Sequence, residues 1–298
     1  MEIEKVGIIG TGTMGLGMAH VIAKAGIPVV AVKATPGSTD RAQQSLAGDL
    51  GKLVDRGKMP AETRDEILAK ITLTTSESDV AECDLVIESV KEDLEIKSAL
   101  FQRLEGIVGP ECLLTTNTST LSVTAMMSVC KERGRVAGLH FFNPAPVMSL
   151  VEVIHAFETS NQSVRRLINF CTAIGKEPVL VQDTTGFIVN RLLTPYILDA
   201  VRMLERGTGT IDAIDRAMMT GAGYPMGPFA LADYIGLDVV YAMASNIYDD
   251  VRQQYCSPPH TLQRLVQLGY LGRKTSKGFY SYATKPPSPN PQLRHPVA

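Results

Sequence analysis

The chain has 298 residues, a length typical of two domains, and 45% of them are hydrophobic. Its 29 basic and 31 acidic side chains give a net charge of −2, so we expect neither nucleic acid nor a membrane as its main partner. The five cysteines are widely spaced and form no Cys-x-x-Cys pair. This pattern argues against a disulfide framework or a bound metal. It fits a cytoplasmic protein, or the processed form of an organellar one.

The first half of the chain alternates strand-like and helix-like segments. The predicted strands are apolar throughout, which indicates a parallel sheet covered by helices on both faces. We therefore predict a Rossmann-type, doubly wound α/β sheet over residues 1–184. Strands are predicted at residues 6–10, 28–32, 71–74, 85–88, 113–116 and 136–139, with helices at 14–25, 39–56, 60–70, 94–105 and 123–131.

Beyond about Asp183 only helical periodicity remains, so we expect an all-helical C-terminal domain over residues 185–284. Helices are predicted at residues 186–206, 211–220, 228–235, 238–250 and 261–268. Pro195 within the first of these predicts a kink or a break. The extensive apolar faces of this domain predict a homodimer formed through it. The proline-rich end, residues 285–298, is expected to be a disordered tail.

A dinucleotide-binding motif opens the chain. Gly10, Gly12 and Gly15, with Thr13 and Met14 between them, fit G-x-G-x-x-G between a predicted strand and a helix. The first glycine allows a tight turn, the second lets a pyrophosphate approach the backbone, and the third lets the helix pack on the strand. The N–H groups at the helix start would face the phosphates. The alternative is a glycine-rich turn that binds nothing.

The second strand ends in Lys33 rather than in the acidic residue that would bind the ribose hydroxyls of NAD. A lysine cannot accept those hydrogen bonds, but it attracts a 2′-phosphate, to which Thr35 could donate and Arg41 could contribute. We therefore predict that the cofactor is NADP in preference to NAD. In the alternative interpretation Lys33 is a solvated loop charge, and NAD binds through its pyrophosphate.

A histidine and a glutamate are the strongest catalytic candidates. His140 ends a predicted strand, and Glu152 stands alone among apolar residues twelve positions later. A buried carboxylate is costly unless it is paired, so two neighbouring strands are expected to bring these side chains together. The glutamate would fix the imidazole tautomer and leave the other ring nitrogen as a base. The alternative is a structural pair in the core.

Two further polar residues stand where ligand-binding groups are found. Ser119 belongs to the cluster Asn-Thr-Ser-Thr (117–120) that follows a predicted parallel strand, although such residues also form ordinary turns and helix caps. Asn190 lies at the start of the C-terminal domain, where its amide could reach a cleft or simply face solvent.

These residues together resemble the L-3-hydroxyacyl-CoA dehydrogenase family, close to its 3-hydroxybutyryl-CoA dehydrogenases. The resemblance extends from about Lys5 to Tyr282. Its most specific stretches are NTSTLSV (117–123), GLHFFNPAPVMSLVEVI (138–154), DTTGFIVNRLL (183–193), GAGYPMGPFALADYIGLD (221–238) and GRKTSKGFYSY (272–282). This family catalyses hydride transfer between a 3-hydroxyacyl-CoA and a nicotinamide cofactor, so the resemblance implies an acyl-CoA substrate.

The resemblance also implies roles for individual residues. It makes His140 the base that takes the 3-hydroxyl proton and Glu152 its orienting partner, and it places Ser119 and Asn190 at the substrate or nicotinamide end. The positions implied to lie along the cofactor are Glu92, Lys97 and Asn143. Lys33 departs from the acidic residue of the family pattern, which puts the cofactor in question rather than the chemistry.

Two other functions stay open from the sequence. One is a dehydrogenase of the same build that acts on a hydroxy acid or sugar acid without CoA. The other is a non-catalytic protein, structural or nucleotide-sensing, that retains the fold. Three basic residues, Lys52, Arg56 and Lys58, could contact the phosphates of CoA, but a solvated helix face is the better explanation for each of them individually.

Overall fold

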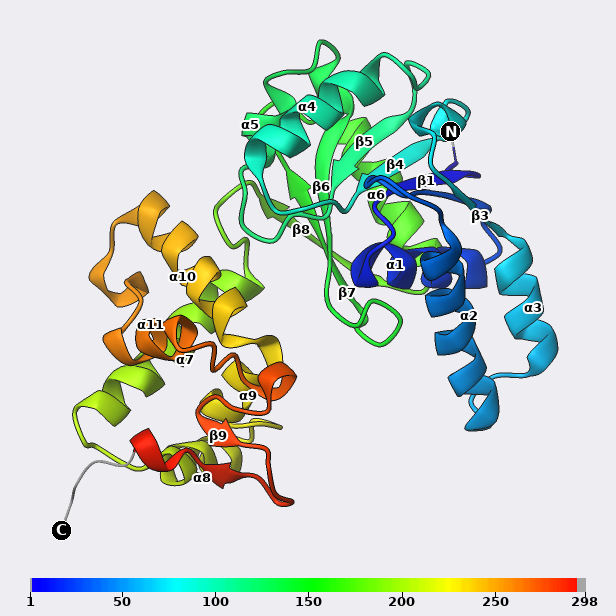
Figure 1. Ribbon diagram of the computed structural model, residues 1–298. Helices are drawn as coiled ribbons and strands as arrows, with labels where there is room; N and C mark the ends of the chain where they lie inside the picture. Colours follow the sequence, from blue (N-terminus) through cyan, green and yellow to red (C-terminus); the bar gives the residue numbers. More distant parts are fainter. Residues whose placement is uncertain (1, 294–298) are drawn as a thin grey trace. The chain divides into compact units, whose positions relative to one another are not determined.

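A computed structural model describes residues 2–293 of the chain (Figure 1). The chain divides into two compact units between Phe187 and Ile188, three residues beyond the predicted boundary. Across the described residues, no helix is long and apolar enough to cross a membrane. Each unit has its own hydrophobic core, so each is described by itself.

The first unit is built on one eight-stranded sheet in the order β3-β2-β1-β4-β5-β6-β7-β8. Every neighbouring pair is parallel except β6 and β7, which run antiparallel. The strands are β1 (Val6–Ile9), β2 (Val29–Val32), β3 (Ile71–Thr74), β4 (Leu85–Glu88), β5 (Leu113–Thr116), β6 (Val136–Phe141), β7 (Leu150–His155) and β8 (Glu177–Gln182). The chain order reverses beside β1, so the crevice at the carboxyl ends of β1 and β4 is the place where such a sheet binds a ligand.

Helices cover both faces of this sheet, as the apolar strands predict. They are α1 (Thr13–Lys24), α2 (Asp40–Asp55), α3 (Ala61–Ala69), α4 (Leu94–Glu105), α5 (Val123–Met127) and α6 (Asn161–Ala173), with 3-10 turns η1 (Glu77–Val80) and η2 (Arg133–Arg135). Adjacent residues of β1 enter different cores: Ile8 packs with Met18 of α1, and Ile9 packs with Phe101 of α4. Each fully buried side chain of this size contributes about 1.5–3 kcal/mol. The predicted doubly wound sheet is confirmed.

Two elements of the first unit, α6 and β8, are absent from the sequence prediction. Strand β8 is an edge strand that starts Glu177-Pro178, and most of its side chains are exposed. A proline and two-sided exposure remove the alternation by which a strand is recognised. Helix α6 is amphipathic and packs Leu167 and Phe170 against the sheet. Together they extend the sheet past β7 and cover one of its faces.

The second unit is helical, as expected, with one small ribbon in addition. Its elements are α7 (Val189–Glu205), α8 (Ile211–Gly221), α9 (Pro228–Ile235), α10 (Leu237–Val251), α11 (His260–Gln267), the 3-10 turns η3 (Gln254–Cys256), η4 (Arg273–Thr275) and η5 (Pro291–Leu293), and the antiparallel strands β9 (Tyr280–Ser281) and β10 (Ser288–Pro289). The predicted break at Pro195 does not occur, because α7 runs through it. The buried stripe from Ile197 to Leu204 stabilises the helix beyond the proline.

The chain from Lys285 to Leu293 differs from the disordered tail that its composition predicts. Strand β10 in this segment pairs with β9, and Asn290 is fully buried. The Asn290 side-chain amide donates to the Gly278 carbonyl at 2.8 Å, and its backbone N–H donates to the Phe279 carbonyl at 2.8 Å. The pairing with β9 and the buried Asn290 together therefore hold this segment. The rest of the predicted tail, residues 294–298, lies outside the described residues.

Buried Asp233 in α9 holds the segment with β9. Its carboxylate accepts the N–H groups of Phe279 at 2.9 Å and Tyr280 at 2.8 Å, and the Tyr282 hydroxyl at 3.0 Å. Burial raises the pKa of Asp233 to about 6, although the two N–H groups and the tyrosine hydroxyl favour the charged form. The folded-state pKa thus lies above the ordinary value of 3.8. The stabilisation from this carboxyl is therefore complete when the pH lies below its ordinary pKa. It is lost as the pH rises through the pKa of the folded state.

We expect the free energy of unfolding of the wild type, relative to Asp233→Asn, to fall by about 1–2 kcal/mol between pH 5 and pH 7.5. Asparagine does not titrate, so the variant isolates this one carboxyl. Urea unfolding of both proteins at the two pH values measures the difference. Parallel pH dependence in the two proteins would contradict the raised pKa.

Candidate active site

The three glycines at the start of α1 differ in what a side chain at their position would meet. Gly10 has φ +117°, and a Cβ there would lie 2.2 Å from the Ser89 carbonyl oxygen. A Cβ on Gly15 would lie 1.8 Å from the Gly10 carbonyl oxygen. A Cβ on Gly12 would meet no protein atom within 4 Å. Gly10 and Gly15 are thus required by the turn itself, whereas Gly12 leaves room for something outside the protein.

The N-terminus of α1 is prepared for an anion. Its N-cap is Gly12, which supplies no side-chain hydrogen bond, and the first turn has no acidic residue. The first N–H groups of the helix therefore lack a side-chain cap, and the positive end of the helix dipole is not neutralised. A pyrophosphate fits both the free N–H groups and the open space beside Gly12.

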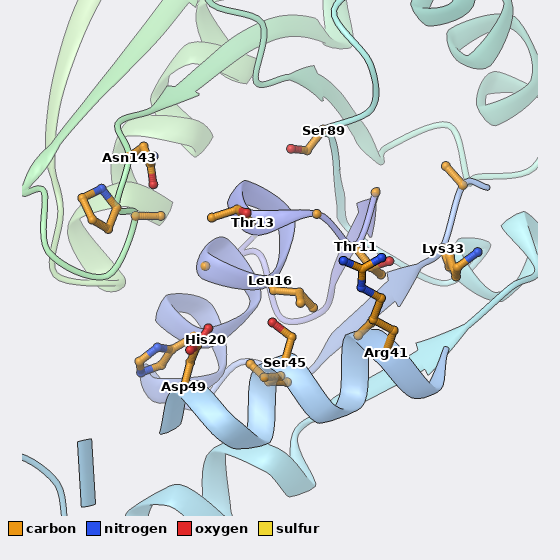
Figure 2. Close-up of a pocket in the computed structure, with 18 of the residues that line it drawn as sticks. Thr11, Thr13, Leu16, His20, Lys33, Arg41, Ser45, Asp49, Ser89 and Asn143 are labelled. Carbon is orange, nitrogen blue, oxygen red and sulfur yellow. The ribbon is translucent and has the colours of Figure 1, made fainter. Parts of the chain in front are cut away.

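A cavity of about 660 Å³ lies against this turn (Figure 2). Its walls are the glycine turn, one face each of α1 and α2, the end of β2, the turn after β4, and the loop after β6. The lining includes Gly10, Thr11, Gly12, Thr13, Leu16, Gly17, His20, Lys33, Ala34, Thr35, Arg41, Ala42, Ser45, Leu46, Asp49, Leu50, Ser89, Val90, Lys91, Asn143, Pro144, Ala145 and Pro146. This is the crevice that the sheet topology places beside β1.

The sequence-predicted cofactor residues divide into two groups. Gly10, Gly12, Thr13, Lys33 and Asn143 line the cavity, whereas Met14, Gly15, Glu92 and Lys97 do not. Met14 packs against the first unit's core, and Gly15 lies against the Gly10 carbonyl within the turn.

Sequence reasoning missed the opposite end of the cavity, where Leu16, His20, Ser45 and Asp49 lie. Leu16 and His20 lie four residues apart on α1, as do Ser45 and Asp49 on α2, and this spacing is the only signal that the sequence carries for them. Burial is the main cause that lowers the pKa of His20, so a neutral imidazole faces the cavity near pH 7.

Two basic side chains stand at the end of β2. The Lys33 ammonium donates to the carbonyl oxygens of Thr35 and Pro36 and to the Thr35 hydroxyl, so it stabilises the loop of residues 33–36. Arg41 is exposed on the first turn of α2, and in the described part of the chain its guanidinium has no hydrogen bond or ion pair. In Figure 2 both residues lie at the end of the cavity away from His20 and Asp49. The only carboxylate of the described lining is thus remote from β2.

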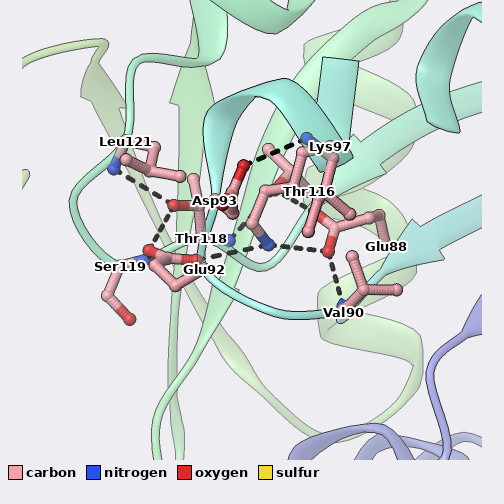
Figure 3. A network of polar contacts seen from close by, with 10 residues as sticks. Glu88, Val90, Glu92, Asp93, Lys97, Thr116, Thr118, Ser119 and Leu121 are labelled. Carbon is pink, nitrogen blue, oxygen red and sulfur yellow. Dashed lines mark hydrogen bonds and ion pairs between the residues drawn. The ribbon is translucent and has the colours of Figure 1, made fainter. Parts of the chain in front are cut away.

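Glu88, Glu92 and Lys97 form a network beside the loop of residues 117–122, which we call the Ser119 loop (Figure 3). The Lys97 ammonium lies 2.6 Å from a Glu88 carboxylate oxygen and 3.2 Å from one of Glu92, and its side chain is 1% exposed. Glu88 also accepts from the Thr116 hydroxyl at 2.6 Å. A buried charge needs such partners, so Lys97 belongs to the interior rather than to the cavity wall.

Glu92 connects this network to Ser119. Its carboxylate accepts the Thr118 hydroxyl at 2.6 Å and the Ser119 N–H at 2.9 Å. Figure 3 shows the Ser119 side chain pointing away from the network. Within residues 2–293 the Ser119 hydroxyl has no hydrogen-bond partner. The backbone of this residue is therefore fixed while its hydroxyl stays available.

His140 and Glu152 lie directly opposite each other on β6 and β7. The His140 Nδ1 atom is 2.8 Å from a Glu152 carboxylate oxygen, and the two side chains are buried. The rings of Phe142 and Phe187 pack against the imidazole, with centroid distances of 4.6 and 5.5 Å. The expectation that neighbouring strands join these side chains is confirmed. Because Nδ1 is engaged by the carboxylate, Nε2 is the nitrogen left for other chemistry.

Asn117 ties the strand of His140 to the Ser119 loop. Its side-chain oxygen accepts the Phe141 N–H at 2.8 Å. The sequence placed Asn117 in a polar cluster without a role, since this contact joins positions 24 residues apart.

The remaining predicted residues lie elsewhere. Asn190 stands in the first turn of α7, in the second unit, so the geometry of the first unit does not include it. Of the candidates for CoA phosphates, Lys52 pairs with Asp49 at 2.8 Å, and Arg56 and Lys58 are exposed just beyond it. No cluster of three or more metal-ligating side chains occurs within the described residues.

We expect Gly12→Ala to weaken binding of NADH and NADPH about tenfold or more, because its Cβ would occupy the space that the pyrophosphate needs. The melting temperature should not change, since that Cβ touches no protein atom and the backbone has φ −76°. Fluorescence titration with each cofactor measures the affinity. Gly15→Ala is the contrasting variant: its Cβ would clash with the Gly10 carbonyl, so its melting temperature should fall. Unchanged affinity in Gly12→Ala would refute the phosphate site.

Comparison with known proteins agrees with this geometry. Residues 5–184 match the family model of the NAD binding domain of 3-hydroxyacyl-CoA dehydrogenase, and residues 186–282 match that of its C-terminal domain. A 3-hydroxybutyryl-CoA dehydrogenase of Mycobacterium tuberculosis is 38% identical over 94% of this chain and 99% of its own length. The human mitochondrial hydroxyacyl-coenzyme A dehydrogenase is 40% identical, covering 94% of this chain and 91% of its own.

A solved structure gives the same result. The crystal structure of (S)-3-hydroxybutyryl-CoA dehydrogenase from Ralstonia eutropha superposes with a TM-score of 0.90 at 36% identity, and the match covers 95% of this chain and 100% of that one. The family models span nearly the whole of this chain, and the relatives match at full length. The chain therefore belongs to the 3-hydroxyacyl-CoA dehydrogenase family.

Proposed function

We propose that this chain interconverts (S)-3-hydroxyacyl-CoA and 3-ketoacyl-CoA thioesters, with 3-hydroxybutyryl-CoA as its typical substrate. The single observation that carries the proposal is the buried His140–Glu152 pair in a unit that also has a dinucleotide cavity. Membership of the family and the names of its relatives favour an acyl-CoA substrate over a hydroxy acid without CoA.

In this mechanism His140 is the general base. Nε2 would take the proton of the substrate 3-hydroxyl, and the Glu152 carboxylate on Nδ1 would hold the required tautomer and stabilise the imidazolium that forms. A bound nicotinamide cofactor supplies the hydride acceptor. In the reverse direction the imidazolium returns the proton to the forming alkoxide. The Ser119 hydroxyl and the Asn190 amide are the proposed donors to that oxygen.

We expect His140→Gln to lower kcat by about 10²–10⁴-fold, the usual contribution of a general base. Cofactor affinity should stay near that of the wild type, because His140 does not line the dinucleotide cavity. Stopped-flow reduction of acetoacetyl-CoA and fluorescence titration with cofactor measure the two quantities.

Glu152→Gln serves as the matched variant for the orienting role. It keeps the size of the side chain but removes the charge that stabilises the imidazolium, so kcat should fall less than in His140→Gln. Wild-type turnover in either variant would remove that residue from the mechanism.

We further infer that NADP is the preferred cofactor. Lys33 and Arg41 give the end of β2 a positive charge, and the described lining offers no carboxylate there to bind the ribose hydroxyls of NAD. The Arg41 guanidinium is unpaired in the described structure, so it is better placed than Lys33 to bind a 2′-phosphate. Guanidinium and phosphate form strong bidentate hydrogen bonds. Lys33 would add to the local potential and shape the loop.

We expect Lys33→Asp and Arg41→Ala each to lower the ratio of kcat/KM for NADPH to that for NADH by about tenfold or more, equivalent to about 1.4 kcal/mol. Aspartate at position 33 also restores an acceptor for the ribose hydroxyls. Lys91→Ala removes a positive charge from another wall of the cavity and is the control that should leave the ratio unchanged. A wild-type enzyme that strongly prefers NADH would defeat the inference.

Three earlier expectations stay predictions. The first unit would bind the cofactor, and the second would complete the substrate site. The homodimer rests on apolar side chains that are exposed in the second unit, such as Leu192, which is 70% exposed. A cytoplasmic location rests on composition alone.

A further inference from the structure

We propose that Asp183 is a positioning residue for Ser119, which it acts on through the loop that carries this serine. The inference rests on the role proposed for Ser119. The loop of residues 117–122 connects β5 to α5, and a carboxylate from a distant part of the sequence holds it at each end. Glu92 holds its start, through the Thr118 hydroxyl and the Ser119 N–H. Asp183 holds its end.

Asp183 makes three contacts there. Its carboxylate accepts the Thr124 N–H at 2.6 Å, the Val123 N–H at 3.1 Å and the Ser122 hydroxyl at 3.2 Å. The two N–H groups belong to the first turn of α5, where the helix leaves them without an intrahelical partner. A charged acceptor on such groups is stronger than a neutral one. Asp183 therefore fixes the point at which the loop becomes helix.

The backbone of Asp183 is itself anchored to the sheet. Asp183 follows β8 directly, and its N–H donates at 3.1 Å to the carbonyl of His155, the last residue of β7. Strand β7 also carries Glu152. Through Asp183, the Ser119 loop is thus anchored to β7, the same strand that carries the partner of the proposed base. Displacement of this anchor would move Ser119 relative to His140.

Asp183 also lies close to the end of the first unit. That unit ends at Phe187, four residues later, and the Phe187 ring packs on the His140 imidazole. The short segment from Asp183 to Phe187 therefore contacts the Ser119 loop at one end and the ring of His140 at the other. This is the reason to expect a catalytic effect rather than only a structural one.

We expect Asp183→Asn to lower kcat for acetoacetyl-CoA reduction by about 10- to 100-fold, since small displacements of a reacting group have effects of this size. Cofactor affinity should not change, because neither Asp183 nor the 117–122 loop lines the dinucleotide cavity. Hydrogen exchange should speed up at the amides of residues 119–124. Ser122→Ala, which removes only the 3.2 Å contact to Asp183 and the Ala125 cap, is the milder variant should Asp183→Asn fail to fold.

Glu105→Gln is the matched control. The Glu105 carboxylate also holds backbone N–H groups, those of Lys131 and Glu132 at 2.9–3.0 Å, but beyond the other end of α5. The same loss of a carboxylate contact there should lower the melting temperature without changing kcat. An equal loss of kcat in Glu105→Gln would show that general loosening of α5 explains the effect, and this would overturn the proposal.

A double-mutant cycle with Ser119→Ala separates the positioning role proposed for Asp183 from the role proposed for Ser119 itself. If Asp183 acts through Ser119, Asp183→Asn lowers kcat in the wild type but has little further effect on Ser119→Ala. Independent, multiplicative losses would overturn the inference about Asp183 and leave the role of Ser119 intact. If Ser119→Ala keeps wild-type turnover, the role proposed for Ser119 fails, and the positioning role of Asp183 fails with it.

Discussion

The antiparallel pairing of β6 with β7 places the His140 imidazole opposite the Glu152 carboxylate in a buried part of the sheet. Burying an isolated carboxylate costs several kcal/mol, so the register of these strands is set partly by the need of Glu152 for a partner. A slip of either strand by one residue would turn that strand's side chain to the other face, away from its partner. The one antiparallel pair of an otherwise parallel sheet is therefore also the place where the proposed base acquires its orientation.

Carboxylates that accept backbone N–H groups recur at the points where this chain has no regular hydrogen-bond partner. Glu92 and Asp183 hold the Ser119 loop, Glu105 holds the chain after α5, and Asp233 holds the segment with β9. Each joins segments far apart in the sequence, 26 to 60 residues apart. A charged acceptor makes a stronger hydrogen bond than a neutral one, so these carboxylates hold the irregular segments in place. The loops that carry functional side chains can thus be irregular without being loose.

Local patterns predicted the parts of this protein that depend on neighbouring residues. The glycine turn, the apolar strands and the lone Glu152 each carry their signal within a few positions. Contacts between distant positions left no such trace: Asn117 with Phe141, and the end of the cavity at His20 and Asp49. Lys97 shows the limit of inference by resemblance, since the side chain expected along the cofactor is buried between two glutamates.

The charge at the end of β2 can change independently of the proposed His140–Glu152 pair because the sheet separates them. Strands β1, β4 and β5 lie between β2 and β6, so Lys33 and His140 are about four strand spacings, or about 19 Å, apart. Under the proposed cofactor preference, Lys33 would therefore act on the cofactor's ribose at a strand end that is remote from the His140–Glu152 pair. The architecture thus separates the strand end that carries Lys33 from the strand end that carries the proposed base.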